Sequence, residues 1–258
     1  MDASKPIVFY DIMSGTEPYC TFAPNPCKIR YALNFKRVHY KTEWVDLPDV
    51  PSVREKLGLA ANRTHWDGSP FHTLPAIKDL STGETIGDSF DIALYLDKQG
   101  PGAGQLFPPA TIGLTKAFNK YVDALFTNNV VILCLHGMPM NPATAEQTKA
   151  TFLWRTQKKS WEEFDIAPED RVKALESFKT VLGEFAITYS VGVDKSTGGG
   201  GPFLDGRAIP TYADLIVGGW LGYMSASLPG QEWDEVKTWH DGLWGRIYEA
   251  LEKYAEIK

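Results

Sequence analysis

The sequence predicts an α/β domain followed by an all-α domain, and three observations lead to this prediction. Strand-like and helix-like patterns alternate over residues 1–100, as in a small sheet with crossover helices. Residues 101–109 belong to a segment dense in Gly and Pro, which is typical of a linker. Residues 110–258 show long helical patterns and almost no strand signal. The chain has 258 residues, which is long enough for two such domains.

The first domain is expected to follow the order β-α-β-α-β-β-α. Short runs of β-branched and aromatic residues indicate the strands. Proline is tolerated in the first turn of a helix, so the first helix is expected to begin at Pro24. A turn-rich link between the last two strands predicts a hairpin. The expected elements span residues 6–10, 24–34, 39–45, 50–59, 74–78, 84–86 and 90–98.

The second domain is expected to consist of helices alone. Pro168 followed by two acidic residues is a typical helix start. Thr211 is a good N-cap, and Asp214 three residues later completes a variant of the capping box. The expected helices span 115–135, 143–164, 168–185, 215–221 and 233–257.

Composition and charge argue against some classes of binding partner. Apolar residues make up 43% of the chain and charged residues 22%, which is typical of a folded, soluble protein. The 26 basic and 32 acidic residues give a formal net charge of −6, and no basic stripe offsets it. We therefore expect neither nucleic acid nor a membrane surface as a partner. No apolar run approaches the roughly 20 residues that a membrane span needs.

The cysteines and the N-terminal residues indicate the cellular location, and the histidines indicate whether a metal is expected. Three cysteines at irregular spacing argue against a disulfide framework and favour a reducing environment. No signal peptide is visible, so a cytoplasmic location is expected. The five histidines show no metal-binding spacing, and no metal is expected.

Two expected helix starts are candidate anion sites, because helix N-termini carry unpaired N–H donors and the positive end of the macrodipole. One lies at Pro24 and the other at Ser89. Ser89 suits a carboxylate, and the neighbouring Asp88 suits an ammonium, so that together they fit an α-amino acid group. The alternative is that Ser89 only caps its helix while Asp88 favours the dipole.

The segment Thr73-Leu74-Pro75 precedes a strand. A cis bond at Pro75 would turn the backbone of Leu74 outward, where it can pair with an extended peptide. An ordinary trans proline at a strand start is the alternative.

The start of the first helix also suits a thiolate, either of the chain or of a ligand. Cys20 lies in the preceding loop, and Cys27 lies within the first turn, where it can instead be a buried, inert thiol. The two are not spaced as C-x-x-C, so dithiol redox chemistry has little support.

These motifs, in this order, resemble the cytosolic glutathione transferases over both domains. The helical-domain signature of that family is similar to residues 203–206 together with Thr211 and Asp214. Pro24-Asn25 and residues 30–36 look most like the fungal FuA class, which is similar to bacterial lignin β-etherases. The resemblance implies a thioredoxin-like N-terminal domain, a C-terminal helical bundle, glutathione as co-substrate and a homodimer.

The resemblance also implies roles for residues. Asp88 and Ser89 would hold the γ-glutamyl end of glutathione, while Leu74 would pair with its cysteinyl part and Thr73 would lie beside it. The family fold would make the bond before Pro75 cis.

The sulfur site departs from the family pattern. Ala23 stands where similar enzymes commonly carry a serine, and alanine cannot donate a hydrogen bond to a thiolate. We expect Asn25 and the backbone N–H groups of the helix start to stabilise the thiolate, with Thr21 as a weaker candidate hydroxyl.

The acceptor site is expected between the two domains. Its candidate wall is aromatic or apolar, although each member can equally belong to the core. The candidates are Tyr10, Met13, Phe22, Phe118, Tyr121 and Phe126.

Three functions remain open on the sequence. The first is a transferase whose glutathione thiolate attacks small aromatic or hydrophobic electrophiles, in detoxification or in cleavage of lignin-type β-aryl ethers. The second is a non-catalytic, ligandin-like binding protein for phenolics, which Ala23 favours. The third is a thiol reductase acting through Cys20 or Cys27.

Overall fold

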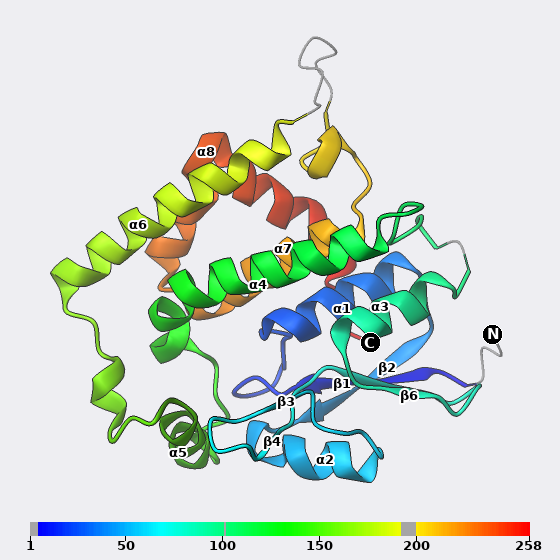
Figure 1. The fold of residues 1–258 in the computed structure, drawn as a ribbon, viewed down its shortest axis with the longest axis horizontal. Coiled ribbons are helices and arrows are strands. Elements are labelled where there is room, and N and C mark those ends of the chain that lie inside the picture. Colours follow the sequence, from blue (N-terminus) through cyan, green and yellow to red (C-terminus); the bar gives the residue numbers. More distant parts are fainter. Residues whose placement is uncertain (1–4, 101, 192–199) are drawn as a thin grey trace.

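The computed structural model describes residues 5–100, 102–191 and 200–258 (Figure 1). Its first part contains a four-stranded mixed sheet in the order β2-β1-β5-β6. β1 (Ile7–Ile12) is parallel to β2 (Tyr40–Val45), and it is antiparallel to β5 (Ala76–Asp79). β6 (Thr85–Ile86) completes the hairpin with β5.

Three helices cover this sheet. α1 (Pro24–Phe35) connects the two parallel strands and lies with α3 (Ser89–Asp97) on one face, whereas α2 (Val50–Lys56) lies on the other (Figure 1). The first helix begins at Pro24, as predicted from proline's tolerance in the first turn. The expected thioredoxin-like arrangement is confirmed.

A second, two-stranded sheet was not predicted. β3 (Arg63–Thr64) pairs with β4 (Pro70–Phe71), and a tight turn joins them. In that turn Gly68 has φ 83°, a backbone conformation that glycine adopts without a steric penalty. The strands have two residues each, too short for a period-two pattern to reveal them.

The second part is helical, as predicted, but one expected helix ends early and another is interrupted. Its helices are α4 (Ile112–Cys134), α5 (Ala145–Thr156), α6 (Pro168–Ala186), α7 (Tyr212–Ser227) and α8 (Gly230–Leu251). The helix expected over 143–164 ends at Thr156, because Gln157 is left-handed with φ 58°, and a separate 3-10 turn follows at Trp161–Phe164. α8 is interrupted at residues 239–242, where His240 and Asp241 also have positive φ.

The two parts share one hydrophobic core, and α1 lies at its centre. α1 packs against α7 over most of its length and is buried from Pro26 to Phe35. Gly219 of α7 permits this close approach, since a Cβ there would lie 2.5 Å from the carbonyl oxygen of Pro24. α7 therefore fixes the position at which α1 begins.

Candidate functional site

A cavity of about 750 Å³ lies where the sheet domain meets α4 and α7. Its walls come from six parts of the chain: the start of α1, the segment at β3, the loop before β5, the start of α3, one side of α4 and Trp220 of α7. Five residues with a predicted role line it: Asn25, Thr73, Leu74, Asp88 and Ser89. The structure thus brings the peptide-binding and sulfur-binding candidates into one place.

The start of α1 offers fewer backbone donors than expected. Its N-cap is Ala23, which makes no side-chain capping bond, and Pro24 and Pro26 have no N–H. Among the first three helical residues, only Asn25 has a backbone N–H that can donate to an anion. The expectation of several free N–H groups at this helix start was therefore wrong.

The side chain of Asn25 is oriented by a buried lysine. Lys28 Nζ donates to Asn25 Oδ1 at 2.8 Å and pairs with Asp123 Oδ1 at 2.7 Å. Because the amide oxygen faces Lys28, the amide NH2 faces elsewhere, and it has no partner among the residues described. Burial lowers the pKa of Lys28, while the nearby Asp123 carboxylate opposes that shift. The asparagine is therefore available as a side-chain donor in the cavity.

Asp123 links this network to the helical part of the protein. Trp220 Nε1 donates to Asp123 Oδ1 at 2.8 Å, and Asn119 Nδ2 donates to Asp123 Oδ2 at 2.9 Å. All three line the large cavity, and none was predicted. The i, i+4 spacing of Asn119 and Asp123 places them on one face of α4, but nothing in the sequence connects them to Lys28.

The loop before β5 is held by residues from outside the predicted motif. The peptide bond between Leu74 and Pro75 is cis, as the family resemblance implied. Arg54 of α2 donates to the carbonyl oxygens of Thr73 and Gly87, both at 2.8 Å. Arg54 thereby joins the loop before β5 to the residue that precedes the α3 start.

The hydroxyl of Thr73 is already in use. It donates to Asn62 Oδ1 at 2.9 Å, and the Asn62 amide in turn donates to the carbonyl oxygen of Gly87 at 2.9 Å. Arg54 and Asn62 thus fix the same two loops from different sides.

At the start of α3 the roles of two neighbours differ from the prediction. Asp88, not Ser89, is the N-cap, and its Oδ1 accepts from the N–H groups of Phe90 and Asp91 at 2.9 and 3.3 Å. The Ser89 hydroxyl has no partner among the described residues, whereas its carbonyl oxygen accepts from Tyr212 at 3.0 Å. A ligand can therefore use the hydroxyl of Ser89 and the second carboxylate oxygen of Asp88.

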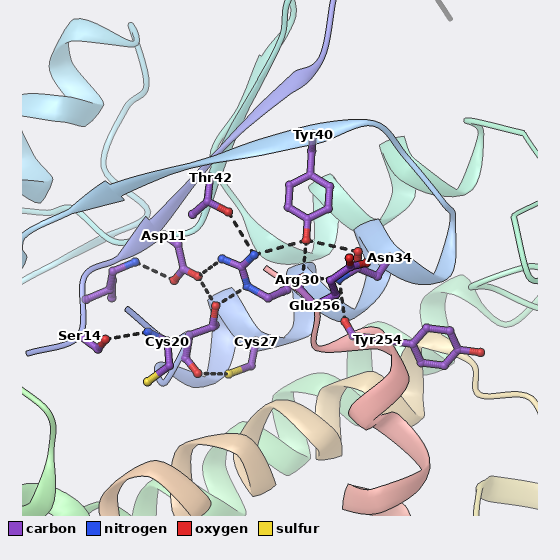
Figure 2. Close-up of polar contacts among 12 residues, drawn as sticks. Asp11, Ser14, Cys20, Cys27, Arg30, Asn34, Tyr40, Thr42, Tyr254 and Glu256 are labelled. Carbon is purple, nitrogen blue, oxygen red and sulfur yellow. Dashed lines mark hydrogen bonds and ion pairs between the residues drawn. The ribbon is translucent and has the colours of Figure 1, made fainter. Parts of the chain in front are cut away.

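Thr21 does not line the cavity. Its hydroxyl donates to Asp11 and accepts from Arg30, and it completes a buried ion pair in which Arg30 lies 2.8 Å from Asp11. Arg30 also approaches Tyr40, which binds the carbonyl oxygen of Glu256 (Figure 2). Burial raises the pKa of Asp11, while Arg30 and Thr21 oppose that shift. The structure uses Thr21 to satisfy this ion pair rather than to contact a thiolate.

The chain's own thiol at α1 is inert. Cys27 is buried, with its Sγ 3.6 Å from the carbonyl oxygen of Thr21, and burial raises its pKa well above the usual range. A lowered thiol pKa at this position, which the helix start suggested, was therefore not found. Cys20, in the loop before α1, is exposed, but it is not among the residues that line the large cavity. A sulfur beside Asn25 in that cavity is therefore expected from a ligand.

The predicted acceptor wall is not assembled. Phe22 and Phe126 are buried in the hydrophobic core, where removal of an aromatic ring from water is favourable. Tyr10 lines a separate cavity beside Trp44, and Phe118 and Tyr121 pack against Phe185. None of these five residues, nor Met13, lines either of the two cavities described at the start of α1.

A smaller, unpredicted cavity of about 160 Å³ lies beside the α1 start. It shares four residues with the large cavity: Pro24, Asn25, Thr73 and Leu74. The rest of its wall is mainly apolar and includes Ile12, Ala23, Leu47, Val50 and Phe71. A sulfur beside Asn25 would face an apolar compartment of this size.

A thioredoxin-like domain followed by a helical domain, with a cavity where the two meet, is the architecture of a glutathione transferase. Residues 22–99 match the glutathione S-transferase N-terminal domain family, and residues 113–254 match the glutathione S-transferase C-terminal domain family. The chain belongs to the glutathione S-transferase family.

Fungal members of the family are similar over nearly the whole chain. A glutathione S-transferase of Ceriporiopsis subvermispora, solved with glutathione, is 32% identical, with a TM-score of 0.86 and coverage of 98% of this chain and 99% of that one. GSTFuA3 of Phanerochaete chrysosporium is 28% identical, with a TM-score of 0.81 and 98% coverage of both chains. The glutathione S-transferase-like protein ustS of Aspergillus flavus is 27% identical, covering 98% of this chain and 94% of that protein. The resemblance to the FuA class is confirmed.

The described residues contain neither a membrane-spanning helix nor a cluster of metal ligands. None of the helices there combines the length and apolar character that a membrane crossing needs. No group of three or more His, Cys, Asp or Glu side chains within 5–100, 102–191 and 200–258 is arranged to hold a metal ion.

Proposed function

We propose that this chain is a glutathione transferase that binds glutathione in the large cavity. In this arrangement Asp88 and the Ser89 hydroxyl hold the γ-glutamyl end, and the backbone of Leu74 pairs with the cysteinyl part. The observation that carries the proposal is the convergence of the α1 start, the cis-proline loop and the α3 start on one cavity. Its volume of about 750 Å³ is within the range of small-molecule sites.

The sulfur is placed beside Asn25. The backbone N–H and the side-chain amide of Asn25 donate to the thiolate, and the macrodipole of α1 adds to its stabilisation. The thiolate attacks an electrophilic carbon of an aromatic or hydrophobic acceptor in the adjoining apolar cavity. A carbon–sulfur bond forms, and the leaving group departs with its electron pair. Proximity and electrostatic stabilisation supply the catalysis, without a covalent enzyme intermediate.

Among acceptors, we propose β-aryl ethers, from which the thiolate would displace a phenolate. The support for this is the likeness to the FuA class, which resembles the lignin β-etherases. We also propose that the protein is cytoplasmic and forms a homodimer. Its chain is divided into a glutathione-binding domain at residues 1–100, a linker at 101–109 and a helical domain at 110–258.

A ligandin-like carrier of phenolics is the second candidate. Ala23 favours it, because the α1 start has neither a serine hydroxyl nor more than one backbone donor in its first three residues. A thiol reductase acting through Cys27 is less well supported, since Cys27 is buried and its pKa is raised, which leaves the exposed Cys20 as the candidate for that function. Turnover of 1-chloro-2,4-dinitrobenzene or of an aryl ether with glutathione, set against retention of an unmodified phenolic, separates the first two candidates.

The direct test is glutathione binding by calorimetry. Ser89→Ala is expected to weaken binding about tenfold or more, because a hydrogen bond to a charged carboxylate is lost. Ser52→Ala on α2 is the matched control, since that hydroxyl binds only the carbonyl oxygen of Asp49 and lies outside the cavity. Equal affinities in the two variants would remove Ser89 from the site, and no binding to the unmodified protein would end the proposal.

A further inference from the structure

One cation beside the small cavity has no anionic partner. Arg155 reaches this cavity from α5 and is partly buried. Within the described residues no ion pair includes Arg155, and its buried Nε makes no hydrogen bond. A guanidinium has five N–H donors and remains charged, so its partial burial without an anion is costly unless a ligand supplies one.

Phe71 brings a second guanidinium close to the first. Arg155 Cζ lies 4.5 Å from the centroid of the Phe71 ring, and Arg63 Cζ lies 4.9 Å from it. Arg63 lines the large cavity, whereas Arg155 lines the small one. Burial, and then the nearby Arg63 cation, lower the pKa of Arg155. Each of the two adjoining cavities therefore has its own arginine.

His72 is another polar side chain at the small cavity, which Asn25 and Thr73 also line. Its Nδ1 is buried and has no partner among the residues described. With its proton on Nδ1, a neutral histidine donates to an anion. The apolar Ile12, Leu47 and Val50 line the same cavity. The cavity is thus suited to a molecule with an apolar body and an acidic group.

We propose that the small cavity is a carboxylate-binding subsite in which Arg155 holds the carboxylate and His72 donates a second hydrogen bond. Arginine pairs with carboxylates through two parallel N–H···O bonds, which suits its planar group held against Phe71. The volume of about 160 Å³ accommodates one ring or a short chain. This inference rests on the proposed function. Its carboxylate can come from an acidic acceptor or from the glycyl end of glutathione.

Binding of an acid and its amide tests the acceptor as the source. The dissociation constants of 4-nitrobenzoate and 4-nitrobenzamide are measured calorimetrically on protein loaded with S-methylglutathione, which cannot react. We expect the unmodified protein to prefer the benzoate and Arg155→Gln to lose about tenfold of that preference, because a charge-assisted pair is lost. Arg155→Lys keeps the charge without the planar fork and should lose less. Lys159→Gln, which removes an exposed cation shortly after α5, should keep the preference.

A second arm tests glutathione itself as the source. Glutathione and its glycyl amide are titrated into the same variants. A loss of affinity in Arg155→Gln for glutathione, but not for the amide, assigns the carboxylate to the glycyl end. The subsite is overturned if Arg155→Gln behaves like Lys159→Gln in both arms. Failure of the proposed function would look different, since the unmodified protein would then bind no glutathione at all.

Discussion

At the scale of single residues, the sulfur site depends on how Asn25 is held. Lys28 fixes the amide oxygen of Asn25 at 2.8 Å, and Asp123 neutralises Lys28 from α4. The amide NH2 of Asn25 has no partner among the described residues, so it is available to a ligand in the cavity. A stable orientation of this kind reduces the reorganisation needed when charge develops on sulfur.

Asn25→Ala is therefore expected to raise the pKa of the glutathione thiol in the complex. Loss of one hydrogen bond to a charged group corresponds to about 1–2 pKa units. The measurement is the ultraviolet absorbance of the bound thiolate against pH. Asn129→Ala is the control, because that amide donates to the carbonyl oxygen of Leu125 within α4. The same thiol pKa in both variants would mean that Asn25 is not the donor.

Ala23→Ser should have the opposite effect. Ala23 is the N-cap of α1, where serine is favoured, and it lies on the wall of the small cavity. A hydroxyl there can donate to the thiolate in addition to Asn25, so we expect the thiol pKa to fall by about 1 unit. Turnover of 1-chloro-2,4-dinitrobenzene should rise with it. An unchanged pKa together with unchanged turnover would contradict this account of the departure from the family pattern.

At the scale of elements, the start of α7 carries a buried acid whose titration affects stability. Asp214 accepts from the N–H groups of Leu204 and Thr211, both at 2.8 Å, in the predicted capping box. Burial raises its pKa from 3.8 to about 6, although these hydrogen bonds oppose the shift. As the pH rises between these values, the unfolded state loses this proton first. The contribution of Asp214 to the free energy of unfolding is therefore largest below about pH 4 and falls as the pH rises to about 6.

Asp214→Asn removes this titration. The free energy of unfolding of the unmodified protein, relative to that of the variant, should fall as the pH rises from about 4 to about 6 and then level off. Urea unfolding at a series of pH values measures the difference. A difference that stays constant or grows through this window would contradict the raised pKa.

Helix starts were easier to predict than helix ends. Pro24 and Pro168 each open a helix where expected, because proline at the first position is a local signal. The end at Gln157 and the break at His240 were missed, since both residues adopt left-handed conformations that are rare outside glycine and depend on their surroundings.

The same distinction applies to the candidate site. Asn25, Leu74 and Asp88 belong to short sequence motifs and were predicted to meet at one site. Arg54 and Arg155 were missed, because each reaches the site from a distant helix and no spacing in the sequence links it to those motifs. Thr21 was misassigned because its hydroxyl binds the buried Asp11–Arg30 pair. That pair forms only in the folded chain, and no local sequence pattern indicates it.

At the scale of the whole molecule, contact between the two domains positions the α1 start. A Cβ at Gly219 of α7 would lie 2.5 Å from the carbonyl oxygen of Pro24 and 2.8 Å from Cγ of Lys28. Gly219→Ala is expected to destabilise the protein by about 1–3 kcal/mol through overpacking. It should also weaken glutathione binding, because α1 is displaced.

Gly230→Ala provides the matched control. A Cβ at Gly230 of α8 meets nothing within 4 Å, so this variant should be neutral or slightly stabilised. Urea unfolding and glutathione calorimetry are compared for the two variants. If Gly219→Ala behaves like Gly230→Ala in both, then α7 does not set the position of α1.

The two cavities share Pro24, Asn25, Thr73 and Leu74 in their walls. Whichever molecule arrives first therefore completes part of the surface that receives the second. By thermodynamic linkage, the factor by which glutathione changes the affinity for an acceptor equals the factor by which that acceptor changes the affinity for glutathione. Binding of either substrate should thus change the measured affinity for the other, even when the two do not react.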